Sequence, residues 1–121
     1  MSLSKREKFT NSDIDSSEDI AVIEVADYTA LWIEFLVGVA NLTAFTIEYK
    51  LTGNGDYLPM ASASGDYTTP NFPITKASGN LAAAAFGATV HWARMDVRGV
   101  HTVRIKAAGV SSTITMYASK G

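Results

Sequence analysis

The chain has 121 residues, a size at which one domain can bury an ordinary hydrophobic core. It contains no cysteine, which excludes disulfide bonds, thiolate metal ligands and thiol nucleophiles. Ten basic residues stand against twelve acidic ones, and the basic residues are dispersed along the chain, so the composition argues against nucleic acid as a partner.

The first 19 residues are polar and follow neither the helical nor the strand periodicity. Lys5, Arg6 and Lys8 precede no apolar run, so no secretory signal is expected, and no window is long and apolar enough to predict a membrane partner. We expect residues 1–19 to form a flexible arm that orders against a neighbouring subunit, although a frayed terminus would show the same pattern. Residues 20–121 are then predicted to form a single β-sandwich domain.

After residue 20 the chain is dominated by short segments in which apolar and polar residues alternate. In FTIEYKL, Phe45, Ile47 and Tyr49 point to one face while Thr46 and Glu48 point to the other, as in a strand between a core and water. Clusters of Gly, Asn, Ser and Pro separate such segments, which favours an antiparallel sandwich or barrel. The predicted strands, about seven in number, are 20–25, 31–37, 45–51, 57–61, 91–97, 103–107 and 114–118.

Three segments between these strands lack a clear period. Residues 61–80 contain Pro70 and Pro73, and we expect them to form a long loop that crosses between sheets over the surface. Residues 81–87 (LAAAAFG) fit either one helical turn or a strand of small residues. Residues 53–56 (GNGD) could offer oxygens to calcium or amides to an anion, but a tight turn that requires positive φ uses the same residues and is the favoured interpretation.

The strands on either side of Gly99 can be tested for register. A turn centred on Gly99 would pair Met95 with Val103 and Ala93 with Ile105, which puts every apolar side chain on one face. A sheet-crossing arch at Gly99 would give the same facing. Both arrangements send one polar set outward, namely Trp92, Arg94, Asp96, Arg104 and Lys106.

No residue pattern predicts catalysis, a cofactor or a metal ion. No serine lies in a nucleophile motif, and the Gly99-centred pairing would separate His91 and His101 by roughly 20 Å, too far to share a metal ion. The acidic residues between 13 and 19 lack the spacing of a calcium loop. A small hydrolase would require one histidine to lie about 3 Å from a Ser or Thr hydroxyl. We therefore predict a non-enzymatic protein.

Aromatic residues on polar faces predict binding instead. Trp92 is expected among Arg94 and Arg104 on an outer face, and an exposed tryptophan flanked by arginines is typical of a protein interface. The alternative is a carbohydrate-binding module, in which aromatic rings stack on sugars. The candidate stacking residues for this alternative are Trp32, Tyr57 and Tyr67.

Two segments resemble a known family. FTIEYKLTGNGDYLPM (45–60) and WARMDVRGVHTVRIKAAGVSSTITMYAS (92–119) are similar to segments of small accessory virion proteins of tailed bacteriophages and prophages. The resemblance implies a jelly-roll-like antiparallel β-sandwich of about 7–8 strands that decorates or stabilises a phage head, or serves as a tail accessory subunit. It further implies a homo-oligomer, such as a trimer, made in the host bacterial cytoplasm and bound to capsid or tail proteins in the virion.

Overall fold

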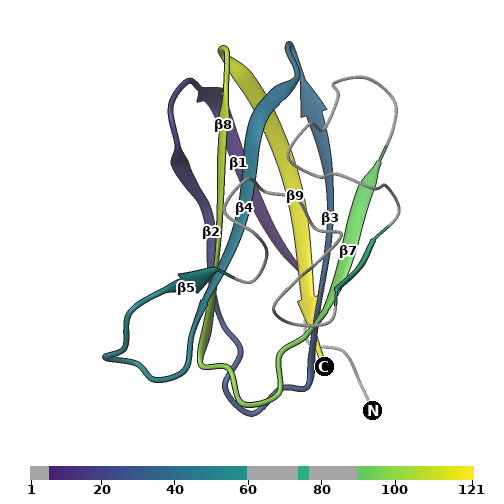
Figure 1. Cartoon of the computed structure of the whole chain (residues 1–121). Helices are drawn as coiled ribbons and strands as arrows, with labels where there is room; N and C mark the ends of the chain where they lie inside the picture. Colours follow the sequence, from purple (N-terminus) through teal and green to yellow (C-terminus); the bar gives the residue numbers. More distant parts are fainter. Residues whose placement is uncertain (1–5, 60–73, 77–89) are drawn as a thin grey trace.

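The computed structural model describes residues 6–59, 74–76 and 90–121, and within these ranges every regular element is a β-strand. The strands lie in two sheets that face each other (Figure 1). One sheet has five strands in the order β1-β9-β3-β7-β6, and the other has four in the order β2-β8-β4-β5. The bounds are β1 Glu7–Ile14, β2 Glu18–Glu24, β3 Ala30–Gly38, β4 Leu42–Lys50, β5 Leu58–Pro59, β6 Ile74–Lys76, β7 His91–Asp96, β8 Thr102–Gly109 and β9 Ser112–Lys120.

The strand pairs are nested along the sequence. β1 pairs with β9, β2 with β8, β3 with β7 and β4 with β5, and all four pairs are antiparallel. The chain therefore resembles one long hairpin rolled into two sheets, which is the arrangement of a jelly roll. Further pairing of β3 with β9 and of β4 with β8 joins these strand pairs into the two sheets. The predicted all-β sandwich is confirmed.

The core lies between the two sheets and is built by the predicted alternation. In β3, Leu31, Ile33 and Phe35 are buried, whereas Trp32 and Glu34 point outward. Side chains from the facing sheet fill the same layer, which is about 10 Å thick in such sandwiches. The Phe35 ring of β3 stacks on a β4 phenylalanine, Phe45, with the ring centres 4.8 Å apart. This stack joins the two sheets at the centre of the core.

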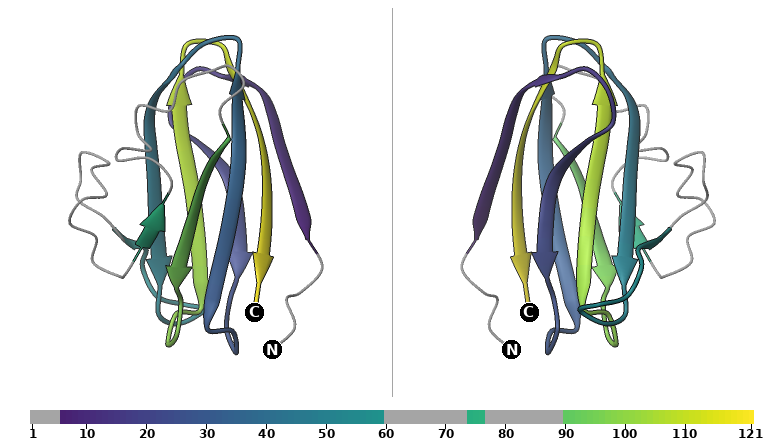
Figure 2. Two further views of the ribbon diagram at one scale, coloured as in Figure 1. Left: turned by 90° about the vertical axis from the view of Figure 1, so that its right-hand side faces the viewer. Right: turned by 90° about the vertical axis from the view of Figure 1, so that its left-hand side faces the viewer.

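The predicted boundary of the folded body at residue 20 is wrong. Residues 7–14 form β1, which pairs with β9 at the edge of the five-stranded sheet (Figure 2). Ile14 is fully buried and Phe9 packs against the core, while the other β1 side chains are more exposed. An edge strand with so few inward apolar residues shows almost no alternation, and for this reason its sequence looks like that of a polar arm.

The predicted ladder between β7 and β8 is also wrong, because the two strands belong to different sheets. The arch that was considered beside it is present, with Gly99 at φ 80°. Its two sides bind different neighbours, since Val97 N donates to Thr29 O and His101 N donates to Lys50 O. The predicted facing is confirmed, since Met95 and Val103 are both fully buried.

The loop predicted over 61–80 contains a strand, β6, which pairs with β7 and extends the five-stranded sheet. Sequence patterns do not show a strand of only three residues between prolines and glycines. The rest of this loop and the segment 81–87 lie outside the described residues. Within the residues that are described, no helix is long and apolar enough to cross a membrane.

The turn at 53–56 joins β4 to β5, as predicted, but the reason for its glycines differs. Gly99 is the positive-φ glycine of the described chain, so Gly53 and Gly55 do not need that conformation. A side chain at Gly55 would meet Thr52 Oγ1 at 2.9 Å, and the Gly55 amide donates to Thr52 O. Close approach of the backbone to the preceding residues therefore explains Gly55.

Candidate binding surface on the five-stranded sheet

The outward face of the five-stranded sheet carries a set of aromatic and charged side chains that we call the aromatic surface. In the pairing register, Glu34 of β3 lies opposite Trp92 of β7 on one side and Tyr117 of β9 on the other. Trp32, two residues before Glu34, lies opposite Arg94 of β7. Arg6, which precedes β1, and Lys8 of β1 complete the surface. Its members are Arg6, Lys8, Trp32, Glu34, Trp92, Arg94 and Tyr117.

Three cations of the aromatic surface lie over aromatic rings. The Arg6 guanidinium carbon is 4.1 Å from the centre of the Tyr117 ring, and Lys8 Nζ is 5.8 Å from the same ring. The Arg94 guanidinium carbon is 5.2 Å from the Trp32 ring centre. Such contacts are favourable because the ring face is negative, and they hold each cation at a fixed place on the sheet.

The charges of this surface are unevenly paired. Arg6 forms an ion pair with Glu34 Oε1, but Arg94 and Lys8 have no ion pair with a carboxylate among the described residues. Within this set three cations accompany one carboxylate, and the nearby Asp96 of β7 is balanced by Arg98, whereas the whole chain has a formal charge of −2. The aromatic surface is locally positive on a negatively charged protein.

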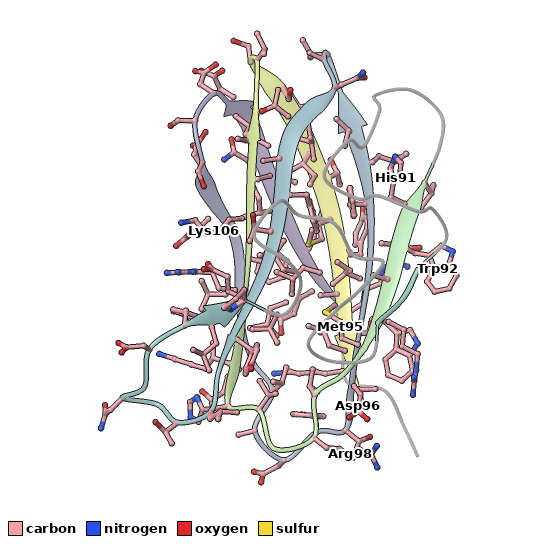
Figure 3. All side chains as sticks on the ribbon, in the orientation of Figure 1. His91, Trp92, Met95, Asp96, Arg98 and Lys106 are labelled. Atoms are coloured by element: carbon pink, nitrogen blue, oxygen red, sulfur yellow. The ribbon has the colours of Figure 1, made fainter. Side chains whose placement is uncertain are left out.

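Two shallow hollows lie on this face. One, of about 230 Å³, is lined mainly by Trp32, Glu34, Trp92 and Tyr117. Its neighbour, of about 220 Å³, is more apolar, and its lining includes Arg6, Leu36 and Val90. Trp92 is 39% exposed and projects away from the interior, whereas Met95 of the same strand points inward (Figure 3). The aromatic surface therefore presents the exposed Trp92 ring beside the hydrogen-bond donors of Arg6.

The structure separates the three residues that were predicted to share an interface. Trp92 and Arg94 lie together on the five-stranded sheet, but Arg104 lies on the outer face of the other sheet, in β8. Arg104 Nη2 is 2.9 Å from Glu48 Oε1, and its guanidinium carbon is 3.8 Å from the Tyr57 ring centre. Through these contacts Arg104 links Tyr57, in the loop before β5, to the four-stranded sheet.

The predicted glycan-stacking residues are also separated. Trp32 lies on the five-stranded sheet, Tyr57 lies under Arg104 on the other sheet, and Tyr67 is outside the described residues. The alternation in 114–118 already placed Tyr117 on the outward side, so that residue could have been found from the sequence. The ion pair of Arg6 with Glu34 could not be predicted from the sequence, because it depends on the pairing of β1 and β3 with β9.

The two histidines occupy structural positions. His91 is buried and stacks on Phe35 with the ring centres 5.3 Å apart. His101 Nδ1 is 2.7 Å from Thr102 Oγ1. This distance is a hydrogen-bond distance, and a catalytic base and its nucleophile must lie equally close. Thr102 is only 6% exposed, however, and no carboxylate in the described part of the chain orients His101. The Thr102 hydroxyl is therefore buried and hydrogen-bonded to its neighbour His101 in the structure.

An ion pair at the protein surface joins Asp96, the last residue of β7, to Arg98. Arg98 Nε donates to Asp96 Oδ1 at 3.0 Å, and the Arg98 backbone amide donates to the same oxygen. These hydrogen bonds lower the pKa of Asp96 to about 2, because both favour the charged carboxylate. Among the described residues, no three His, Asp or Glu side chains come together as metal ligands.

The fold is similar to that of two prophage proteins of known structure. No protein-family model matches this chain, and no curated protein matches it. The crystal structure of the SPBc2 prophage-derived protein YomS matches with a TM-score of 0.60 and 10% identity, over 100% of this chain and 96% of that chain. The PBSX exported protein XepA matches with a TM-score of 0.59 and 16% identity, over 97% of this chain and 38% of XepA. At these identities the likeness shows a common sandwich fold.

Proposed function

We propose that this chain is a non-enzymatic structural protein of a phage or prophage particle, such as a head decoration or capsid-stabilising subunit or a tail accessory subunit. The observation that carries the proposal is the likeness to YomS, a prophage-derived protein, over 100% of this chain and 96% of YomS. The sandwich that produces this likeness has an apolar core between its sheets, and within the described ranges no three His, Asp or Glu side chains gather as metal ligands.

The aromatic surface is the proposed contact surface for other subunits. Tryptophan, tyrosine and arginine are enriched at protein interfaces, where their rings bury a large area and their polar groups form directed hydrogen bonds. Trp92 supplies an exposed ring, and Leu36 and Val90 add exposed apolar area beside it. We propose that capsid or tail proteins, or further copies of this chain in a homo-oligomer, cover this surface in the virion.

Mass spectrometry of particles purified after prophage induction in the source strain tests the proposed function. We expect this protein in many copies per particle, together with capsid and tail proteins, and no comparable amount of abundant host enzymes. Light scattering of the purified protein checks whether it is a homo-oligomer in solution. Particles that lack the protein, prepared from a lysate in which it is abundant, would show that it is not a virion component.

A carbohydrate-binding module is the second candidate, since Trp32, Trp92 and Tyr117 share one face. Stacking on a sugar requires an open ring face, however. Arg94 lies over Trp32 and Arg6 lies over Tyr117, which leaves Trp92 as the more open ring of the three. Because a single open ring is a poor platform for a sugar chain, protein contact is the better-supported function.

A further inference from the structure

We infer that the aromatic surface is a receptor for acidic side chains of a partner protein, with Arg94 as the carboxylate-binding residue and Trp92 as its apolar neighbour. This inference rests on the proposed function, because it specifies the chemistry of the partner that the particle subunit would bind. The partner is an acidic segment of another protein whose Asp or Glu carboxylate contacts Arg94 and whose apolar atoms cover Trp92.

Arg94 lies over a ring and forms no ion pair among the described residues; the carboxylate that it affects through space, Asp96, is hydrogen-bonded to Arg98 instead. The Arg94 guanidinium lies over the Trp32 ring at 5.2 Å, and no ion pair or side-chain hydrogen bond involves it within the described chain. A guanidinium held over a ring still has five N–H donors for other groups. Those donors match the two oxygens of a carboxylate, and little side-chain entropy is lost when the pair forms.

Arg104 on the other sheet shows what a satisfied site of this kind looks like in the same protein. It too lies over an aromatic ring, that of Tyr57, and it binds the Glu48 carboxylate through Nε at 3.0 Å and Nη2 at 2.9 Å. Arg94 has the ring and lacks the carboxylate. A partner that supplies one would give Arg94 the same two contacts.

The charge of the surroundings favours an acidic partner over a basic one. Lys8 and Arg6 add positive charge to the same face. The carboxylates there already have partners, since Glu34 is paired with Arg6 and Asp96 of β7 is paired with Arg98. The Arg6–Glu34 pair is exposed, with 57% of the Arg6 side chain and 45% of the Glu34 side chain open to solvent, so its strength is small. Arg6 is therefore available to exchange Glu34 for a carboxylate of the partner.

Tryptophan fluorescence provides a direct test, because both tryptophans of the chain, Trp32 and Trp92, belong to this surface. The probes are a capped peptide of alternating Asp and Leu, the same peptide with Asn in place of Asp, and an oligomer of glucuronic acid. We expect saturable binding of the Asp peptide that weakens as salt is raised, and at least about tenfold weaker binding of the Asn peptide.

Variants separate this site from general charge attraction. Arg94→Ala should weaken binding of the Asp peptide by about tenfold, and Arg94→Lys should weaken it by less, because it keeps the charge and loses the planar fork. Lys106→Ala is the matched control, since it removes one positive charge from the opposite side of the molecule (Figure 3) and should change the affinity less than about twofold. Glu34→Gln should strengthen binding, because it releases Arg6.

Three results would overturn the inference: equal effects of Arg94→Ala and Lys106→Ala, weaker binding by Glu34→Gln, or tighter binding of the glucuronic acid oligomer than of the peptide. The last result would point to an acidic glycan as the ligand. Circular dichroism of each variant checks that it is folded. If Arg94→Ala does not fold, the comparison of Arg94→Lys with Lys106→Ala still tests the inference. The protein could still be found in particles after any of these results, so this inference and the proposed function can fail separately.

Discussion

Two arginines of this protein, Arg94 and Arg104, show how much of a residue's role depends on its neighbours. Both point outward from a strand, and both lie over an aromatic ring. Arg104 also has a carboxylate partner across the sheet, in Glu48, so its contacts are internal and stabilise the fold. Among the described residues Arg94 has its ring but no ion-paired carboxylate, which leaves its donors for another molecule. Alternation in the sequence predicted the outward direction of both residues but not this difference.

Asp96 offers a test at the scale of a single residue. Its pKa is lowered to about 2 chiefly by the hydrogen bonds from Arg98, and Arg94 contributes a smaller Coulombic effect. The folded pKa is below the ordinary value of 3.8, so the stabilisation is present above that pH and is lost as the pH falls through about 2. Arg98→Ala should therefore raise the pKa of Asp96 toward 3.8.

Carboxyl carbon chemical shifts followed by NMR through an acid titration measure this pKa directly. Arg94→Ala is the control and should move the pKa of Asp96 by less than Arg98→Ala does, because its effect acts only through space. An Asp96 pKa that is the same in the Arg98→Ala variant as in the parent protein would contradict the assignment of the cause.

At the scale of elements, β1 is the instructive case. Polar residues 1–19 read as an arm, but β1 covers the edge of β9 and contributes Ile14 to the core. The pairing partner lies about a hundred residues away, and no local window contains it. The backbone pairing with β9 and the burial of Ile14 together make this polar segment a strand.

Truncation tests the role of β1. A chain that starts at Arg6 should keep the unfolding free energy of the full chain to within about 1 kcal/mol, because β1 is retained. A chain that starts at Glu18, where β2 begins, should lose at least about 3 kcal/mol, because the buried Ile14 side chain is removed and the edge of β9 is exposed. Urea unfolding measures both values. Equal stability of the two chains would mean that residues 7–14 do not belong to the folded body.

At the scale of the whole molecule, the nested pairing makes the two sheets depend on each other. Each successive pair, from β4–β5 outward to β1–β9, joins segments farther apart in the sequence, and neighbours along the chain mostly lie in opposite sheets. Neither sheet is built from one continuous piece of chain. The protein is therefore expected to unfold in a single cooperative step.

The Phe35–Phe45 stack should report on that cooperativity, because it joins the sheets at 4.8 Å. Phe35→Ala should lower the unfolding free energy by about 3–5 kcal/mol and shift the fluorescence and circular dichroism transitions together. Leu36→Ala is the matched control, since the adjacent side chain is 41% exposed on the outer face, and it should cost less than about 1 kcal/mol. Separate transitions for the two probes would show that the sheets unfold independently.

Local residue order sets which strands have a buried face and where most of their side chains point, because it contains a period of two. The sandwich, the outward position of Trp92 and Arg94, and the turn at residues 53–56 could therefore be predicted from it. The pairing partners of the strands emerge from the folded structure. They placed β1 beside β9, divided β7 from β8, and set Arg94 and Arg104 on opposite faces. Pairing joins residues far apart in the chain, and its free energy comes from contacts that no single segment contains.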